Sequence, residues 1–132
     1  MPYAKLVVER ENGYLVATIN NPPVNALSQA VLKELSLLLD ECLNDEEVRA
    51  IVLTGSGEKL FSAGADINEF KHIREGKEPE ISGQELFSKI ENYPKPVIAA
   101  LQGSSYGGGT ELALACHLRI LSASAQMALP EV

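Results

Sequence analysis

The first half of the chain alternates between strand-like and helix-like patterns of hydrophobic positions. Two β-branched-rich segments, Ala4–Arg10 and Tyr14–Ile19, are joined by Glu11-Asn12-Gly13. Because Asn-Gly is a strong turn signal, these segments predict a β-hairpin. Apolar residues then recur at helical spacing from an N-cap at Ser28 to about Asn44, which predicts a helix.

The pattern continues with further strands and helices. Ala50–Thr54 is a short continuous apolar run, typical of a strand that is covered on both faces. The order strand, helix, strand predicts a right-handed parallel crossover. Beyond it, the pattern predicts helices at Ile67–Glu75 and Gln84–Tyr93, a mobile polar loop at Gly76–Ser82, and strands at Val97–Leu101, Leu118–Leu121 and Met127–Leu129.

The stretch Leu101–Glu111 is the most informative part of the chain. An apolar run precedes it, and a segment of strong helix-forming residues follows it. We therefore expect a buried strand that ends in a glycine-rich turn, from which a helix begins. Consecutive glycines, Gly107-Gly108-Gly109, destabilise regular elements and are favoured where backbone must approach something closely. The first amides of a helix lack intrahelical partners and carry the positive end of its dipole, so the Gly108 amide could stabilise an oxyanion. Glu111 lies about one turn further on the same face.

Composition and charge exclude several classes of function. The chain has 132 residues and a net charge of −7, which suits one domain and argues against a nucleic-acid or anionic-membrane surface. Its two cysteines, Cys42 and Cys116, lie in apolar helical patterns and predict buried, reduced thiols. No apolar run is long enough for a membrane helix and no signal peptide is visible, so we expect a cytoplasmic protein.

One motif suggests a different chemistry. Gly103-Ser104-Ser105-Tyr106-Gly107 matches G-x-S-x-G, the nucleophile elbow of α/β-hydrolases, which would make Ser105 a nucleophile. The only later histidine is His117, at the far end of the following helix. A helix rises about 1.5 Å per residue, so His117 would lie more than about 10 Å from the turn. The serine hydrolase therefore remains the weaker alternative.

Four separated segments resemble the signatures of the crotonase superfamily, the enoyl-CoA hydratase/isomerase group. They are N-N-P-P-V-N-A-L (Asn20–Leu27), F-S-A-G-A-D (Phe61–Asp66), Q-G-S-S-Y-G-G-G-T-E-L-A-L-A-C-H-L-R-I (Gln102–Ile120) and A-L-P-E-V (Ala128–Val132). They occur in the family's order and span essentially the whole chain. The sequence near the C-terminus, with C-H-L-R-I and A-L-P-E-V, is similar to the hydratase part of multifunctional fatty-acid β-oxidation enzymes.

The resemblance implies an α/β fold, a crotonase-type spiral of ββα units. It also implies that residues 1–132 are the N-terminal part of one such domain, truncated before the C-terminal helices. The family stabilises a thioester enolate with two backbone amides, which map to Ala65 and Gly108. Its two catalytic carboxylates map to Glu111 and Glu131. Because both acids are present, the resemblance favours hydration of 2-enoyl-CoA, with isomerase or another acyl-CoA activity as the alternative.

The resemblance also implies how substrate binds and how the protein assembles. Coenzyme A would enter as part of the acyl-CoA substrate, with no separate cofactor and no metal. Its substrate-binding residues would be Ala63, Ala65, Asp66, Ile67, Asn68 and Gly108, contacted mostly through backbone. The full-length protein would form a homo-oligomer, a trimer or a dimer of trimers. A truncated chain could instead be a non-catalytic binding or assembly module.

Each candidate residue taken singly also has an ordinary structural explanation. The glycine run could permit tight packing, and Glu111 could complement the helix dipole. Asp66 could cap a helix, and Glu131 could be a surface carboxylate. The joint occurrence of the four segments favours the active-site interpretation.

Overall fold

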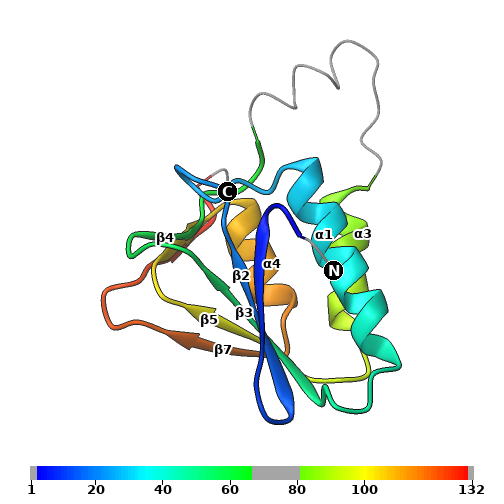
Figure 1. Cartoon of the computed structure of the whole chain (residues 1–132). Helices are drawn as coiled ribbons and strands as arrows, with labels where there is room; N and C mark the ends of the chain where they lie inside the picture. The colour runs from blue at the N-terminus through cyan, green and yellow to red at the C-terminus, as the bar shows by residue number, and fades with distance from the viewer. Residues whose placement is uncertain (1–2, 67–80, 131–132) are drawn as a thin grey trace.

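The structure, a computed structural model, describes residues 3–66 and 81–130, which form two β-sheets and three helices (Figure 1). The larger sheet has the order β1-β2-β3-β5-β7, and these strands are Leu6–Arg10, Tyr14–Ile19, Ala50–Gly55, Val97–Leu101 and Leu118–Leu121. The smaller sheet has the order β4-β6-β8, and its strands are Leu60–Ser62, Ser104–Tyr106 and Met127–Ala128. The helices are α1 (Gln29–Leu43), α3 (Gly83–Glu91) and α4 (Gly108–Ala115).

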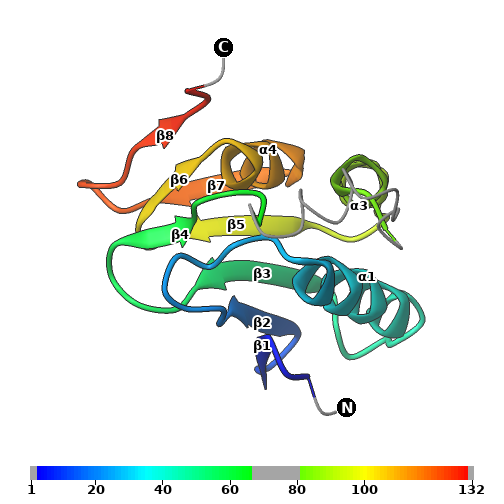
Figure 2. The same cartoon turned by 90° about the horizontal axis from the view of Figure 1, so that it is seen from above.

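A strand–strand–helix unit repeats along the chain. β3 and β4 precede α3, β5 and β6 precede α4, and β7 and β8 follow. In each unit the first strand joins the larger sheet and the second joins the smaller one, parallel to the equivalent strand of the preceding unit. Figure 2 shows β3, β5 and β7 in succession, with β4, β6 and β8 in succession beside them. The predicted spiral of ββα units is confirmed.

The early elements form where the pattern predicts them. β1 and β2 pair antiparallel around a turn in which Gly13 has a φ of 93°. Ser28 caps α1, because its Oγ accepts a hydrogen bond from the Val31 amide at 3.3 Å. β2 and β3 pair in parallel, as the crossover requires.

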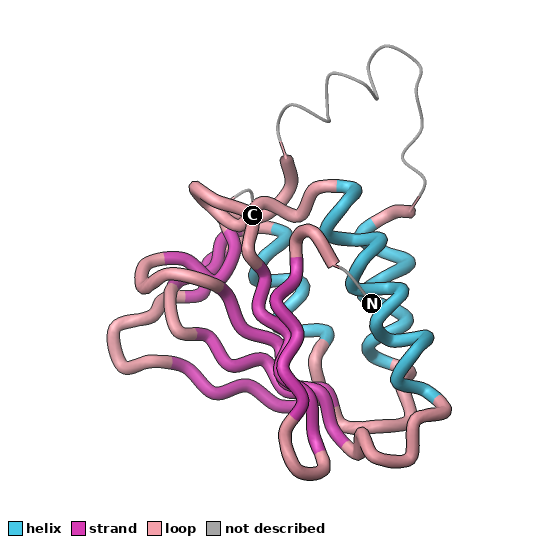
Figure 3. Tube along the Cα trace, in the orientation of Figure 1, coloured by secondary structure: helices cyan, strands magenta, loops and turns pink. Residues whose placement is uncertain are grey.

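Burial along β3 corrects one prediction. Ile51 and Leu53 are buried, whereas Val52 and Thr54 on the other face are only half-buried. The expectation of a strand covered on both faces is therefore wrong for the described residues. The buried face continues through Val97 of β5, which pairs with Ile51, and the helices lie on one side of the larger sheet (Figure 3).

Two short strands, β4 and β6, are absent from the sequence prediction. The segment expected as one glycine-rich turn after Leu101 contains the three-residue strand β6 before α4 begins. Such short strands carry too few residues for a visible period of two. Ile67–Glu75 and residues 76–80 lie outside the described residues, so the predicted helix and loop stay predictions. Ser82, at the end of that loop, caps α3.

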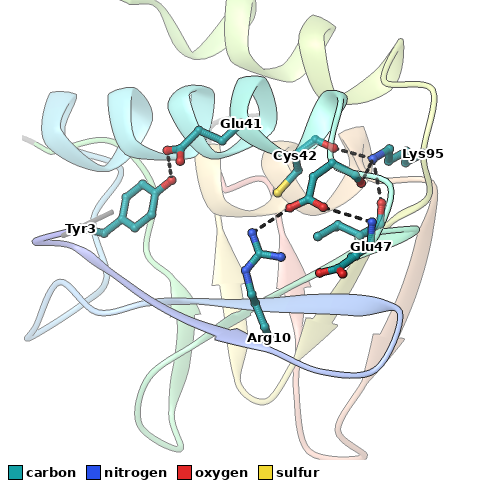
Figure 4. Close-up of polar contacts among 8 residues, drawn as sticks. Tyr3, Arg10, Glu41, Cys42, Glu47 and Lys95 are labelled. Carbon is teal, nitrogen blue, oxygen red and sulfur yellow. Dashed lines mark hydrogen bonds and ion pairs between the residues drawn. The ribbon is translucent and has the colours of Figure 1, made fainter.

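Polar side chains close the C-terminal end of α1 (Figure 4). The Lys95 ammonium donates hydrogen bonds to the carbonyl oxygens of Cys42, Asp45 and Val48. Arg10, on β1, forms an ion pair with Asp45 at 2.8 Å. Lys95 thus binds one carbonyl in the last turn of α1, that of Cys42, and two carbonyls of the segment that follows the helix. None of the helices in the described ranges is long and apolar enough to cross a membrane.

Candidate functional site

The three glycines before and within the first turn of α4 meet three different structural requirements. Gly107 is the N-cap and has φ 53° and ψ −121°, a backbone conformation that glycine adopts readily. A Cβ on Gly109 would lie 2.3 Å from the carbonyl oxygen of Ser62, so α4 and β4 touch through bare backbone. A Cβ on Gly108 would meet nothing closer than 3.5 Å, and that nearest atom is the amide nitrogen of Ala65. Packing therefore explains Gly109, whereas at Gly108 a Cβ would make only ordinary contacts, the nearest with the Ala65 amide.

The amides of Ala65 and Gly108 lie close together in space. Gly64, with a φ of 99°, brings the two segments together, because a Cβ added to it would lie 3.0 Å from the Gly108 nitrogen. Gly108 starts the helix, so its N–H has no partner within α4. Within the described ranges the Ala65 N–H likewise donates to no acceptor, since its bridge to Leu27 uses the Gly64 carbonyl. Two such donors can bind an oxyanion.

The backbone leading to Ala65 is held by hydrogen bonds on both sides. The Ala63 amide donates to the Val24 carbonyl at 3.0 Å, and the Leu27 amide donates to the Gly64 carbonyl at 2.8 Å. The Gly64 amide donates to Ser62 Oγ at 3.1 Å. These bonds fix the backbone on either side of Gly64 and do not use the next amide, that of Ala65.

Asn25 connects the loops that support this segment. It is buried, with 3% of its surface exposed, and has a φ of 52°. Its side-chain amide donates to the carbonyls of Ser56 and Leu60 at 3.1 and 3.0 Å, and its Oδ1 accepts from the Asn21 amide at 3.0 Å. Its own carbonyl accepts a hydrogen bond from Ser62 Oγ at 2.7 Å. One side chain thus joins the loop between β2 and α1 to the segment that runs from β3 into β4.

Of the two predicted catalytic carboxylates, Glu111 lies within the described residues. Glu111 lies in the first turn of α4, is exposed, and follows the Gly108 amide by three residues. The helix dipole favours a carboxylate there. Glu131 lies outside the described residues, so the distance between the two predicted acids is not defined.

A groove of about 390 Å³ runs past Ala65. Pro22, Pro23 and Val24 line one side, and Ala63 and Asp66 line the other with Ala65. It therefore follows the segment predicted to bind substrate through its backbone. The remaining predicted binding residues, Ile67 and Asn68, lie outside the described residues.

The groups needed for a serine hydrolase do not come together. Ser105 is fully buried in β6, and its Oγ lies 3.0 Å from Thr110 Oγ1. His117 follows the C-terminal end of α4, and its Nδ1 accepts a hydrogen bond from the Val97 amide at 2.9 Å. A buried serine and a histidine committed elsewhere do not support a nucleophile elbow.

Both cysteines are free and buried, as the sequence predicts. Burial raises the pKa of the Cys116 thiol to about 12, and the nearby Arg119 acts weakly in the opposite direction. Burial also raises the pKa of Cys42. Neither thiol is activated as a nucleophile.

Sequence reasoning missed the residues that hold the site in place. Asn25 stands within the Asn20–Leu27 segment, but nothing in its pattern showed that its side chain is buried. A positive φ at a non-glycine residue is the signal that only the structure provides. Ser62 and Thr110 give no sequence signal, because their hydroxyls bond to backbone that is distant in sequence.

Comparison with known proteins defines the class. Residues 9–132 match the enoyl-CoA hydratase/isomerase family, and the chain belongs to this family. It is 49% identical over 89% of its length to a probable enoyl-CoA hydratase of Bacillus subtilis, covering 46% of that protein. It is 44% identical over its whole length to a short-chain-enoyl-CoA hydratase of Clostridium acetobutylicum, covering 52% of that protein.

Multifunctional enzymes and solved structures agree with this assignment. A peroxisomal fatty acid beta-oxidation multifunctional protein of Arabidopsis thaliana is 39% identical over 92% of the chain, which covers 17% of that protein. The crystal structure of an enoyl-CoA hydratase from Bacillus anthracis superposes with a TM-score of 0.83 at 33% identity, covering 96% of this chain and 51% of that one. The fold is therefore the crotonase fold, and the chain spans about half the length of the hydratases it matches.

Proposed function

We propose that the full-length protein is an enoyl-CoA hydratase that adds water across the 2,3 double bond of 2-enoyl-CoA thioesters. The observation that carries the proposal is the proximity of the Ala65 amide to Gly108 at the start of α4. Relatives that are named enoyl-CoA hydratases, at 49% and 44% identity, support the same activity.

In this mechanism the substrate's thioester oxygen accepts hydrogen bonds from the Ala65 and Gly108 amides. Attack of water at the β-carbon moves negative charge onto that oxygen, where the two donors and the dipole of α4 stabilise the enolate. Glu111 and Glu131 hold the water between them. One takes its proton, and the other delivers a proton to the α-carbon.

The groove beside Ala65 suits the coenzyme A portion of the substrate. In the proposal the pantetheine arm follows the backbone from Ala63 to Asn68, and coenzyme A enters only as part of the substrate. The full-length protein acts in the cytoplasm as a homo-oligomer, a trimer or a dimer of trimers. The presence of both glutamates favours hydration over isomerisation.

Glutamine substitutions in the full-length protein test this assignment. General acid–base groups contribute about 10²- to 10⁴-fold, so Glu111→Gln and Glu131→Gln should each lower crotonyl-CoA hydration at least about a hundredfold. Because the pair acts as a unit, the double variant should lose much less than the product. Thioester binding should persist, because the backbone amides remain.

Glu85→Gln is the matched control, since Glu85 is an exposed glutamate in the first turn of a different helix, α3. It should leave hydration unchanged. Hydration that persists undiminished in Glu111→Gln would refute the assignment. Measuring double-bond migration in the same samples separates the isomerase alternative, and absence of both activities would favour a non-catalytic module.

A further inference from the structure

Ser105 and Thr110 form a buried pair of hydroxyls that the proposed chemistry does not use. Ser105 is 0% exposed in β6, and Thr110 is 4% exposed in the first turn of α4. Their oxygens are 3.0 Å apart. Burying a hydroxyl is costly unless its hydrogen bonds are satisfied, so the partners of this pair show what it holds.

Thr110 connects α4 to strand β8. Its Oγ1 donates to the Ala128 carbonyl at 2.8 Å and accepts from the Ala128 amide at 3.2 Å. A threonine has one hydroxyl hydrogen, so Ser105 must be the donor in the bond between the two hydroxyls. Both polar backbone atoms of Ala128 are thereby bound to one side chain.

A backbone bond strengthens this connection. The Gly107 amide also donates to the Ala128 carbonyl, at 3.0 Å, so that oxygen accepts from both Gly107 and Thr110. A helix threonine commonly bonds to a carbonyl three or four residues earlier in its own helix. Thr110 bonds across to another strand, which ties β8 to the first turn of α4.

The residues that make this connection are close in sequence to the two proposed catalytic glutamates. Thr110 stands between Gly108 and Glu111, and Ala128 precedes Glu131 by three residues. We infer that the Ser105–Thr110 hydroxyl pair is a positioning device that holds the segment leading to Glu131 at a fixed place beside the helix that carries Glu111. This inference rests on the proposed function, in which both acids hold one water.

Substitutions at Thr110 in the full-length protein test the inference. Thr110→Val keeps the shape and removes the hydroxyl, whereas Thr110→Ser keeps the hydroxyl. We expect Thr110→Val to speed hydrogen exchange of the Ala128 amide about tenfold or more, because its acceptor is lost. We also expect kcat for crotonyl-CoA hydration to fall about 10- to 100-fold with KM changed less than about threefold, since a small misplacement of a catalytic group is costly. Thr110→Ser should restore both.

Ile90→Val is the stability control, because Ile90 is buried in a different helix, α3, and makes none of the hydrogen bonds of the hydroxyl pair. It should leave both Ala128 exchange and kcat near wild type. Ser105→Ala is a milder second variant for the case that Thr110→Val does not fold, since it keeps both Thr110–Ala128 bonds. We expect it to give intermediate losses.

The outcomes separate this inference from the proposed function. Unchanged Ala128 exchange in Thr110→Val would show that the hydroxyl pair does not hold β8. Faster exchange with unchanged kcat would show that it holds β8 without positioning a catalytic group. Either result overturns the inference while hydratase activity stands. If the wild-type protein hydrates no enoyl-CoA, the proposed function and the positioning role both fail, while the exchange result still decides whether the pair anchors β8.

Discussion

Among single residues, the neighbours Gly108 and Gly109 differ in how closely other backbone packs against them. Gly109 packs against the backbone of Ser62, with only 2.3 Å from an added Cβ to the carbonyl oxygen. Gly108 faces space in which a Cβ would make ordinary contacts, the nearest at 3.5 Å. One glycine is needed for folding, whereas the other leaves room beside the Ala65 amide.

Alanine at each position should separate the two roles. Gly109→Ala should lower the free energy of unfolding by about 2–3 kcal/mol, because the added methyl overpacks a backbone contact. Gly108→Ala should change stability by less than about 1 kcal/mol, since alanine is favoured over glycine in a helix. It should nevertheless reduce hydration about a hundredfold, because the methyl would lie 3.5 Å from the Ala65 amide, at the proposed oxyanion position. Urea unfolding and steady-state kinetics of both variants measure this. Full activity in Gly108→Ala would contradict the proposed site.

Only part of this residue-level detail could be predicted from the sequence. The glycine run and the helix that follows it indicated the Gly108 amide, and the resemblance supplied Ala65. Nothing local shows that Gly109 touches Ser62 or that Thr110 bonds to Ala128, because these contacts join segments far apart in the chain. Such contacts depend on how the strands of the smaller sheet align.

At the scale of elements, α1, the hairpin and the main strands followed from periodicity together with the Asn-Gly turn and the Ser28 N-cap. The strands β4 and β6 did not, because three-residue strands have no readable pattern. Yet these strands and the loops around Asn25 place the two amides together. The elements that carry the site are therefore the ones that sequence patterns describe least well.

The loops around the site should depend on Asn25. Asn25→Ala should cost about 2–4 kcal/mol, because it removes several buried hydrogen bonds and replaces asparagine, which tolerates a φ of 52°, by alanine, which tolerates it less well. Asn25→Gly loses the same bonds without the backbone strain, so it should be about 1 kcal/mol less destabilising. Urea unfolding measures both. Asn92→Ala is the control, because Asn92 makes an exposed side-chain bond to Ser88, and it should cost about 1 kcal/mol or less. A cost for Asn25→Ala no greater than the control would refute the role of this side chain.

At the scale of the whole molecule, β7 carries the most exposed large apolar side chains of the described residues. It forms one end of the five-stranded sheet, and Leu118 and Ile120 are 58% and 65% exposed. An edge strand with apolar side chains pairs readily with other chains. A net charge of −7 opposes this contact, and salt screens that repulsion.

The 132-residue chain on its own should therefore associate, and more strongly as salt increases. Light scattering measures the mass. Replacing Leu118 and Ile120 together by lysine should shift the chain toward the monomer, because charges on an edge strand oppose pairing. Leu37→Lys is the control, since Leu37 is an exposed leucine on α1, and it should leave the mass unchanged. A monomeric wild-type chain at high salt would contradict the expectation.

Lys95, which binds carbonyls at the end of α1, bears on the order in which the chain folds. α1 ends at Leu43 without a glycine C-cap, and Asn44 has a φ of −106°. The cation that satisfies the carbonyls of Cys42, Asp45 and Val48 comes from Lys95, about fifty residues later in the chain. The Asn44 and Asp45 amides bind the Cys42 carbonyl locally, and Lys95 adds its three hydrogen bonds only when the segment before β5 docks. Until then, a nascent chain emerging from the ribosome would carry a first helix whose end is held by local backbone bonds alone.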